Sequence, residues 1–265
     1  MFAYASNEPF LYEIDEQQNR LLTEYYLERS YLRFISVCPE IARGAAFRLF
    51  RDYVNLGNKE KAEKWLASLA EIVERDFGCS LEGEELLESL EAGGELVSHM
   101  GGCPYFSLVL PYYLGMYSLL CDDLAGASTH FGNQVRLIEN IRVADPLFWK
   151  EPFDMYETSV FHEAYSLLGA QKRAEAIAGF ELIISGALDQ SQGLLRNGAR
   201  DRRFYYRSLI GRGVALLQLG DAGAALEDFQ TVTLECEESN TDLLGEAESL
   251  LKVAQEQLDS TLITQ

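Results

Sequence analysis

The feature that most constrains the fold of this chain is a pair of amphipathic segments that adjoin each other between residues 208 and 235. The two segments meet at Gly220 and Asp221, a combination that ends one helix and caps the next. Small residues stand where two antiparallel helices would touch, so Gly213 is expected to face Phe229. This stretch therefore predicts a helical hairpin.

The pattern of this hairpin recurs along the chain, and this recurrence predicts the fold class. Four expected second helices share an alanine that is followed four residues later by a large apolar residue. These pairs are Ala62/Leu66, Ala127/Phe131, Ala176/Phe180 and Ala225/Phe229. In two of the hairpins a glycine, Gly115 or Gly213, stands twelve residues before the alanine. The small residues would let the paired helices approach closely, and the large side chain would fill the space beside them.

Proline content and apolar spacing extend the helical prediction to the whole chain. Only six prolines occur and the last is Pro152, which favours long uninterrupted helices in the final 113 residues. No strand-like alternation of apolar and polar residues is longer than four residues. We expect residues 1–102 to form an N-terminal helical segment, with a long helix, one repeat-like hairpin and an acidic linker. Residues 103–265 are expected to form helical repeats that continue the same superhelical domain.

With this pattern the chain resembles the tetratricopeptide repeat (TPR) family. The residues that carry the resemblance are Leu114, Gly115, Ala127 and Phe131 in one hairpin, and Gly213, Leu216, Gly220, Ala225 and Phe229 in another. Ala62 with Gly57 and Asn58 is a partial match. The pair at 176 and 180 fits the family when the turn between Gly169 and Arg173 is longer by about two residues.

The resemblance implies an all-α fold in which antiparallel helix pairs stack as a TPR-like α-solenoid. It also implies that the first helix of each pair lines a concave groove. The recurring alanines are 65, 49 and 49 residues apart, which departs from the repeat of about 34 residues in the family. The prolines that end the repeats of the family are missing. An irregular helical bundle is therefore the alternative fold.

The chain is strongly acidic, with 42 acidic and 22 basic residues and a formal net charge of −20. Such a surface repels nucleic-acid phosphates and anionic lipids, so we expect neither nucleic acid nor a membrane as a partner. Five cysteines at unrelated spacings and the absence of a signal-peptide pattern favour a cytoplasmic location. Residues 76–135 hold nine acids and no lysine or arginine, and the irregular segment 80–102 within them indicates a boundary or a solvent-exposed excursion between two helical halves.

No motif in the chain points to catalysis. The patterns of phosphate loops, dinucleotide-binding loops, zinc proteases and serine hydrolases are all missing from the sequence. We expect no cofactor and no metal, because His99 and Cys103 form only one pair of potential ligands and structural zinc takes about four. An enzyme on a helical scaffold would need His99, Cys103 or Glu157 to converge in one pocket.

The most concentrated feature is basic, because six of the 22 lysines and arginines lie between residues 196 and 212. Arginines in helical register suit a carboxylate or a phosphate, which a guanidinium binds in bidentate fashion. By the resemblance, Arg207 and Ile210 would face the groove together with Tyr112 and Met116 of an earlier first helix. The predicted partner-binding residues are Arg200, Arg203, Tyr206, Arg207, Ile210, Tyr112 and Met116. The alternative is that the arginines pair internally with acids of the C-terminal helices.

These observations favour a non-enzymatic adaptor, a protein–protein interaction module that binds a peptide or a helix of a partner protein in its concave groove. The first alternative is an acidic immunity protein or chaperone that neutralises a basic client through the acidic stretches at 76–135 and 221–259. The second alternative is the enzyme on a helical scaffold. An acidic client of the purified protein would support the adaptor, and a strongly basic client would support the first alternative.

Overall fold

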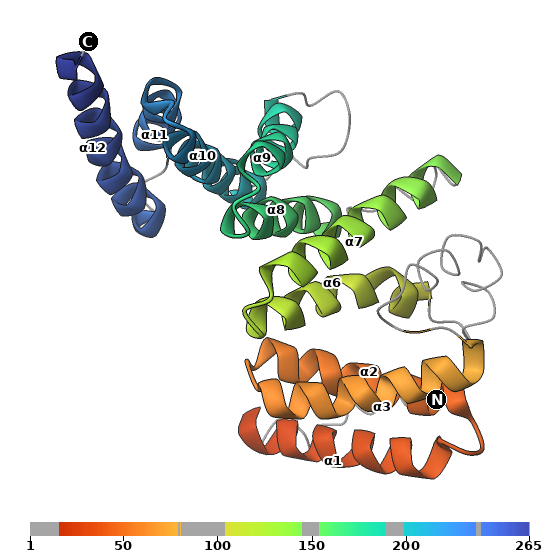
Figure 1. Cartoon of the computed structure of the whole chain (residues 1–265). Helices are drawn as coiled ribbons and strands as arrows, with labels where there is room; N and C mark the ends of the chain where they lie inside the picture. Colours follow the sequence, from red (N-terminus) through yellow and green to blue (C-terminus); the bar gives the residue numbers. More distant parts are fainter. Residues whose placement is uncertain are drawn as a thin grey trace. The chain divides into compact units, whose positions relative to one another are not determined.

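Helices follow one another in packed pairs, and no strand occurs among the residues that the structure describes (Figure 1). The computed structural model describes residues 16–78, 80, 104–144, 154–188, 199–236 and 240–264. Its helices are α1 (Glu16–Phe34), α2 (Pro39–Asn55), α3 (Lys59–Phe77), α6 (Pro104–Leu120), α7 (Leu124–Ala144), α8 (Asp154–Gly169), α9 (Arg173–Leu188), α10 (Ala199–Leu219), α11 (Ala222–Glu235) and α12 (Thr241–Thr264). Within these residues the prediction of an all-α fold is confirmed.

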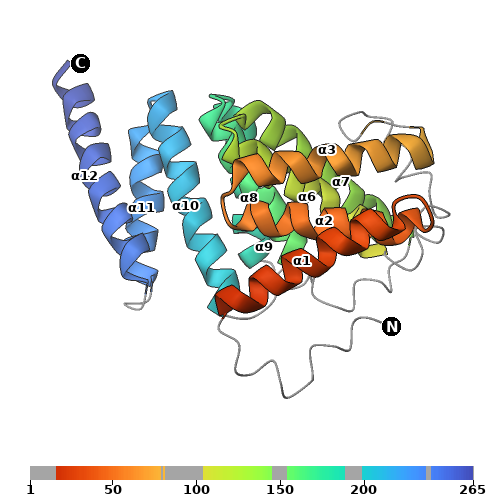
Figure 2. The ribbon, with the colours of Figure 1, turned by 90° about the horizontal axis from the view of Figure 1, so that it is seen from below.

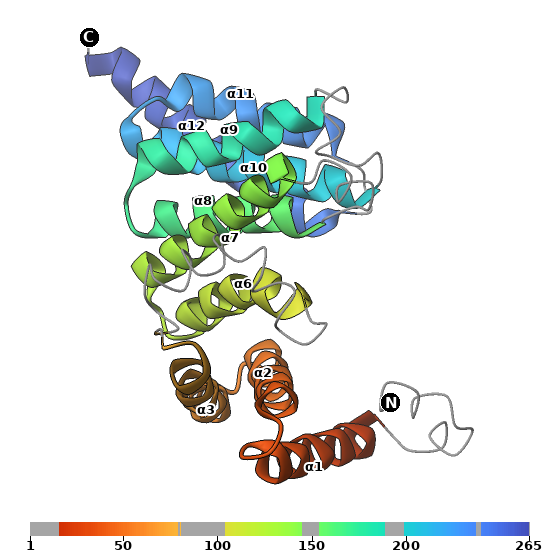
Figure 3. The same ribbon diagram turned by 90° about the vertical axis from the view of Figure 1, so that its right-hand side faces the viewer.

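Contacts between residues divide the chain into two compact units, one up to Ser107 and the other from Leu108. In the first unit α2 packs against both α1 and α3 (Figure 3). The second unit contains α6 to α12, apart from the first turn of α6. There each helix from α7 to α11 packs against the helix that follows it in the chain, and α10 also contacts α8 and α12. Figure 2 shows α11 lying between α10 and α12.

Four helix pairs, α2–α3, α6–α7, α8–α9 and α10–α11, turn in the same way. In each turn one residue adopts a left-handed backbone conformation: Gly57 (φ 66°), Asp122 (φ 61°), Gln171 (φ 63°) and Gly220 (φ 88°). The N–H of this residue donates to the carbonyl three residues earlier, and the next N–H donates to the carbonyl five residues earlier. This is the Schellman arrangement, which satisfies carbonyl groups at the end of a helix.

Side-chain caps begin three of the second helices, as the sequence predicted for Asp221, and in α7 the Oδ1 of Asp123 accepts a hydrogen bond from the N–H of Gly126 at 2.9 Å. Asn58 Oδ1 accepts a hydrogen bond from the N–H of Lys61 at 3.1 Å, and Asp221 Oδ1 accepts one from the N–H of Ala224 at 3.1 Å. Gly78 ends α3 in a left-handed conformation, with a φ of 68°. Turns and caps of this kind specify where each of these helices starts and stops.

The three helix pairs of the second unit repeat with a register of 49 residues. Their left-handed turn residues are spaced in this way, as are the fully buried rings of Phe131, Phe180 and Phe229. A Cβ atom at Gly213 would lie 2.6 Å from Cε1 of Phe229, and one at Gly115 would lie 2.8 Å from Cε1 of Phe131. The predicted approach of Gly213 to Phe229 is thus confirmed.

The middle pair, α8–α9, keeps this register without the longer turn that the resemblance required. Ala164 lies twelve residues before Ala176, at the position that glycine holds in the other two pairs. Its methyl group fits because the facing residue is Gly179, where a Cβ atom would lie 2.9 Å from the Cβ atom of Ala164. The glycine stands on the opposite helix in this pair, and the expected lengthening of the turn was wrong.

The helix pair of the first unit departs from the pattern. Ala62 is fully buried, but the residue twelve positions earlier is Phe50, and its ring is fully buried as well. Leu66 is only half-buried, and the large buried residues of α3 include Trp65 and Leu69 instead. The similarity of this pair to the other three is therefore limited to its turn and its alanine.

Candidate functional site

Apart from Arg196, which is outside the described residues, the predicted basic cluster lies on α10, and two of its arginines pair with acids of the C-terminal helices. Arg203 Nη2 lies 2.5 Å from Oδ2 of Asp242 on α12. Arg212 donates from Nη2 and Nε to the two carboxylate oxygens of Asp228 on α11, at 2.6 and 2.9 Å. Internal pairing, the alternative that the sequence left open, therefore holds for these two residues. Arg200 lies in the first turn of α10, and its side chain is outside the described part of the structure.

Arg207 differs from these two arginines. It is exposed, and within the described part of the chain it makes no hydrogen bond and no ion pair. It lies one turn after Arg203 on α10, close enough to His162 of α8 for its charge to act on that imidazole. A guanidinium whose donors are not engaged by the described residues can bind an external carboxylate.

Tyr206 and Ile210 are buried in the second unit, although the sequence predicted them at a partner-binding surface. Tyr206 is 2% exposed, and its hydroxyl donates to the backbone oxygen of Glu235 at 2.7 Å. Ile210 is 5% exposed and belongs to the same core cluster as Leu209. The resemblance assigned Ile210 to the groove, but this side of α10 packs into its own unit. Neither side chain offers surface to a partner.

Rings on α6, α8 and α10 lie next to one another and form what we call the aromatic row. The aromatic row consists of Tyr112, Phe161, His162, Tyr165 and Phe204. The ring of Tyr112 lies 6.0 Å from that of His162, and the ring of Phe161 lies 5.5 Å from that of Phe204. Tyr165 stacks on Phe161 at 6.2 Å and is 56% exposed. The row thus connects three first helices and reaches the surface.

The 49-residue register explains why these rings lie together. Tyr112 and Phe161 occupy equivalent positions on α6 and α8, and so do Met116 and Tyr165. Met116 is half-buried, one turn after Tyr112. The sequence reasoning named Tyr112 and Met116 but missed the rings of α8, because it did not carry the register from one first helix to the next.

His162 contributes a neutral ring to the row. Burial, with a smaller contribution from the charge of Arg207, lowers the pKa of His162 to about 4. The imidazole is therefore uncharged at pH 7, and it stacks on the ring of Phe131 at 5.2 Å. The positive charge beside the row comes from Arg207.

Glu163 follows His162 on α8 and titrates near neutral pH. Burial raises the pKa of Glu163 to about 7, and the charges of Glu139 and Glu175 act in the same direction. Its carboxyl group occupies space left by Gly132 of α7, where a Cβ atom would lie 2.8 Å from Oε1. The net charge next to the aromatic row therefore changes around pH 7.

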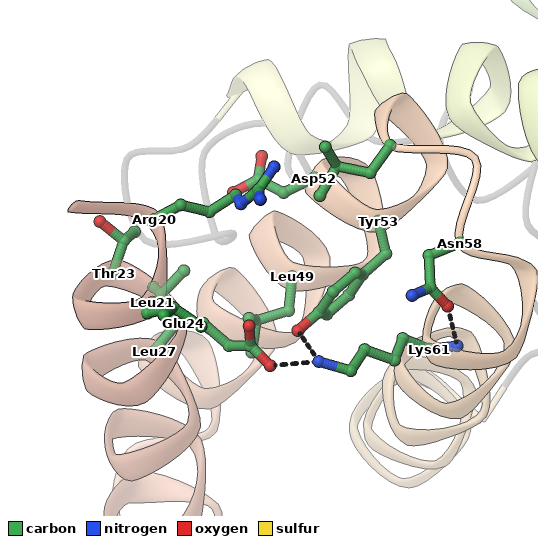
Figure 4. Close-up of a pocket in the computed structure, with 11 residues that line it drawn as sticks. Arg20, Leu21, Thr23, Glu24, Leu27, Leu49, Asp52, Tyr53, Asn58 and Lys61 are labelled. Carbon is green, nitrogen blue, oxygen red and sulfur yellow. Dashed lines mark hydrogen bonds and ion pairs between the residues drawn. The ribbon is translucent and has the colours of Figure 1, made fainter. Parts of the chain in front are cut away.

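The first unit holds a pocket of about 530 Å³ between α1, α2 and α3 (Figure 4). At its wall Lys61 Nζ donates to Oε1 of Glu24 at 2.8 Å and to the hydroxyl of Tyr53 at 3.0 Å. The bond to Glu24 raises the pKa of Lys61. Burial acts to raise the pKa of Glu24, but its interactions with Lys61 and Tyr53 outweigh burial and lower the pKa. Both groups stay charged at neutral pH and hold α1 against α3, so neither is poised for acid–base chemistry.

Of the three residues named for the enzyme alternative, the structure describes Glu157 alone. His99 and Cys103 lie outside the described residues, and Glu157 is a buried residue of α8. Among the side chains that the structure describes, no group of three histidine, cysteine, aspartate or glutamate residues could hold a metal ion. No helix in the same part of the chain is long and apolar enough to cross a membrane.

No family model, no curated protein and no solved structure matches this chain. The features that the geometry brings together are an exposed arginine without a partner among the described residues and a row of rings on three first helices.

Proposed function

We propose that the second unit is a TPR-like protein-binding module that holds an acidic segment of a partner protein against the aromatic row, with Arg207 as the charged contact. The observation that carries the proposal is the state of Arg207. It is exposed, it has no partner among the described residues, and it lies about one turn after Phe204 of the aromatic row on α10, where its charge acts on His162.

The repeated packing supports the TPR-like part of the proposal. Three helix pairs keep one register in their turns, alanines and phenylalanines, and α10 contacts α8 as well as its neighbours in sequence. In a stack of helix pairs, the first helices of successive pairs lie next to each other. The first helices α6, α8 and α10 would then form the inner wall of a concave groove, with the aromatic row along that wall.

A groove of this kind would bind a peptide or a helix through two sorts of contact. The rings of the aromatic row present large, rigid surfaces of the type that is enriched at protein interfaces. Arg207 would supply a bidentate site for a carboxylate. Because His162 is neutral at pH 7, it would stack against the bound segment without adding charge. Preference for an acidic segment would therefore depend on Arg207.

Selection of a random-peptide display library against the purified full chain tests the proposal. We expect the selected peptides to carry aspartate or glutamate beside apolar residues. Arg207→Glu should weaken their binding about tenfold or more at low salt, and the difference should shrink as salt is added.

Arg203→Glu is the matched control for this experiment. It makes the same change of charge one turn earlier on α10, at an arginine that pairs with Asp242 where both side chains are about half exposed. Such a pair contributes at most about 1 kcal/mol to stability, so this variant should fold and should bind nearly as the parent does. Equal losses in the two variants would show that general charge governs binding. Selected peptides rich in lysine and arginine would support the neutraliser of a basic client instead.

A further inference from the structure

We propose that the outward face of α1 is a second interaction surface, which binds an acidic amphipathic helix of a partner protein. This α1 face consists of Leu22, Tyr25, Tyr26, Arg29, Leu32 and Arg33, and all six side chains are exposed. The α1 face belongs to the first unit. This proposal therefore does not depend on the aromatic row or on the function proposed for the second unit.

The α1 face is a continuous strip along one side of the helix. Its residues recur at intervals of three and four, which places them in line over about three turns. Tyr26 is 64% exposed and Leu32 is 71% exposed. The opposite side of α1 packs into the first unit, where Tyr31 is buried with its ring 5.2 Å from that of Trp65 on α3. The strip is therefore separate from the described core of its unit.

The charges on the α1 face are all positive. The acids of α1 whose side chains are described, Glu24 and Glu28, turn toward α3, where they lie 2.8 and 3.5 Å from lysine ammonium groups. Arg29 and Arg33 remain on the strip, each over an aromatic ring of α1 itself. Within the described ranges neither guanidinium pairs with a carboxylate. The face thus combines apolar side chains with basic groups that remain available.

The rest of the chain shows how unusual this combination is. Residues 16–78 contain ten acidic and ten basic residues, so the net charge of −20 arises outside this stretch. The exposed residues of α12, as far as its side chains are described, are polar or small apart from Val253. The water-facing side of α12 is therefore polar, whereas the α1 face has the composition of an interface.

An acidic amphipathic helix fits the α1 face better than other occupants do. From Leu22 to Arg33 the strip is about 16 Å long, which is the length of three turns of a partner helix. Apolar residues at three- and four-residue spacing would pack on Leu22, Tyr25 and Leu32, and flanking carboxylates would meet Arg29 and Arg33. A second copy of the same face would bring arginines together without an acid. An anionic membrane would have to overcome the net charge of −20.

Two designed helical peptides of about eighteen residues test this proposal. Both have leucines at three- and four-residue spacing, and the flanking positions are glutamate in one peptide and lysine in the other. Fluorescence anisotropy measures the binding of each labelled peptide to the full chain at low salt. We expect the glutamate peptide to bind about tenfold more tightly than the lysine peptide. The double variant Arg29→Glu/Arg33→Glu should reverse this preference.

Two further variants separate this surface from the aromatic row. Tyr26→Ser/Leu32→Ser should weaken binding of the glutamate peptide about tenfold while the circular dichroism spectrum stays unchanged, because both side chains are exposed. In an Arg207→Glu background, which removes the contact proposed for the aromatic row, the same two substitutions on α1 should still weaken the remaining binding about tenfold. If Arg207→Glu abolished binding of the glutamate peptide and the α1 variants bound it as the parent does, the peptide would be assigned to the aromatic row. That result would overturn this proposal.

The proposal is also overturned if the two peptides bind equally, if neither binds, or if the charge reversal leaves the preference as it was. Two other occupants are tested with the same Arg29→Glu/Arg33→Glu variant. A dimer in light scattering that this variant separates would assign the face to a second copy. Vesicles of phosphatidylserine and phosphatidylcholine that bind the parent but not the variant would assign it to a membrane.

Discussion

Replacing Gly213 by alanine tests the packing on which the repeat depends. A Cβ atom at this position would lie 2.6 Å from Cε1 of Phe229. This is about 1 Å closer than two carbon atoms favourably approach. Because the ring of Phe229 is fully buried, the ring or one of the helices α10 and α11 has to move.

The expected loss follows from two opposing effects. Overpacking of a core costs about 1–3 kcal/mol, whereas alanine is a better helix former than glycine by about 1 kcal/mol. We therefore expect Gly213→Ala to lower the free energy of unfolding by up to about 2 kcal/mol. Gly245→Ala in α12 is the matched control, because no atom lies within 4 Å of the position that its Cβ would take. The same substitution there should raise the free energy of unfolding by up to about 1 kcal/mol.

Urea unfolding followed by circular dichroism measures these variants against the parent chain. The double variant Gly213→Ala/Phe229→Leu adds a sharper comparison, because leucine leaves room for the new methyl group. Its loss of stability should be smaller than the sum of the two single losses. Additive losses would refute the reasoning, and so would a Gly213→Ala variant as stable as Gly245→Ala.

Four other predictions concern single side chains of the second unit. Gly179→Ala should lower the free energy of unfolding by about 1–2 kcal/mol, and adding Ala164→Gly to this variant should restore part of the loss. No recovery in urea unfolding of the double variant would contradict the exchange of small residues between α8 and α9. Gln134→Leu should raise the urea midpoint and add about 1–3 kcal/mol, since its amide is fully buried without a partner among the described residues and the equivalent positions hold isoleucine and valine. Because the pKa of His162 is lowered from 6.5 to about 4, its contribution to the free energy of unfolding is complete above pH 6.5 and is lost as the pH falls from 6.5 to 4. In thermal melts, His162→Phe should therefore lose less stability over this pH range than the parent does. Because the pKa of Glu163 is raised from 4.5 to about 7, its contribution to the free energy of unfolding is complete below pH 4.5 and is lost as the pH rises to 7. The melting temperature of Glu163→Gln should therefore change less between pH 5 and 8 than that of the parent, and an unchanged pH dependence would contradict this.

The sequence predicted those parts of the fold that depend on local chemistry. Gly220 with Asp221 marked a turn and a cap because both residues have strong conformational preferences there. Asp122 and Gln171 adopt the same left-handed conformation, which aspartate adopts only occasionally and glutamine rarely, so the identical turns at these positions were not visible. The glycine of the middle pair was missed, because it stands on the second helix, at Gly179, and not twelve residues before the alanine.

The candidate site was predictable in its chemistry but not in its orientation. Arg207 and Tyr206 are adjacent on α10, yet one is exposed and the other is buried, because packing within the unit sets which side of the helix faces inward. The ion pair of Arg203 joins it to Asp242, 39 residues away, a separation that no local spacing predicts. The rings of α8 could have been found by moving 49 residues along the chain from Tyr112 and Met116.

Photo-cross-linking tests most directly where a partner segment binds. An acidic peptide from the display selection, synthesised with a photoreactive group next to its carboxylate, would be irradiated with the full chain and the cross-linked residues identified by mass spectrometry. We expect cross-links at Tyr165, Phe204 and Arg207, and their loss in Arg207→Glu. Cross-links on α1 or α12, with no labelling of the aromatic row, would contradict the proposed function.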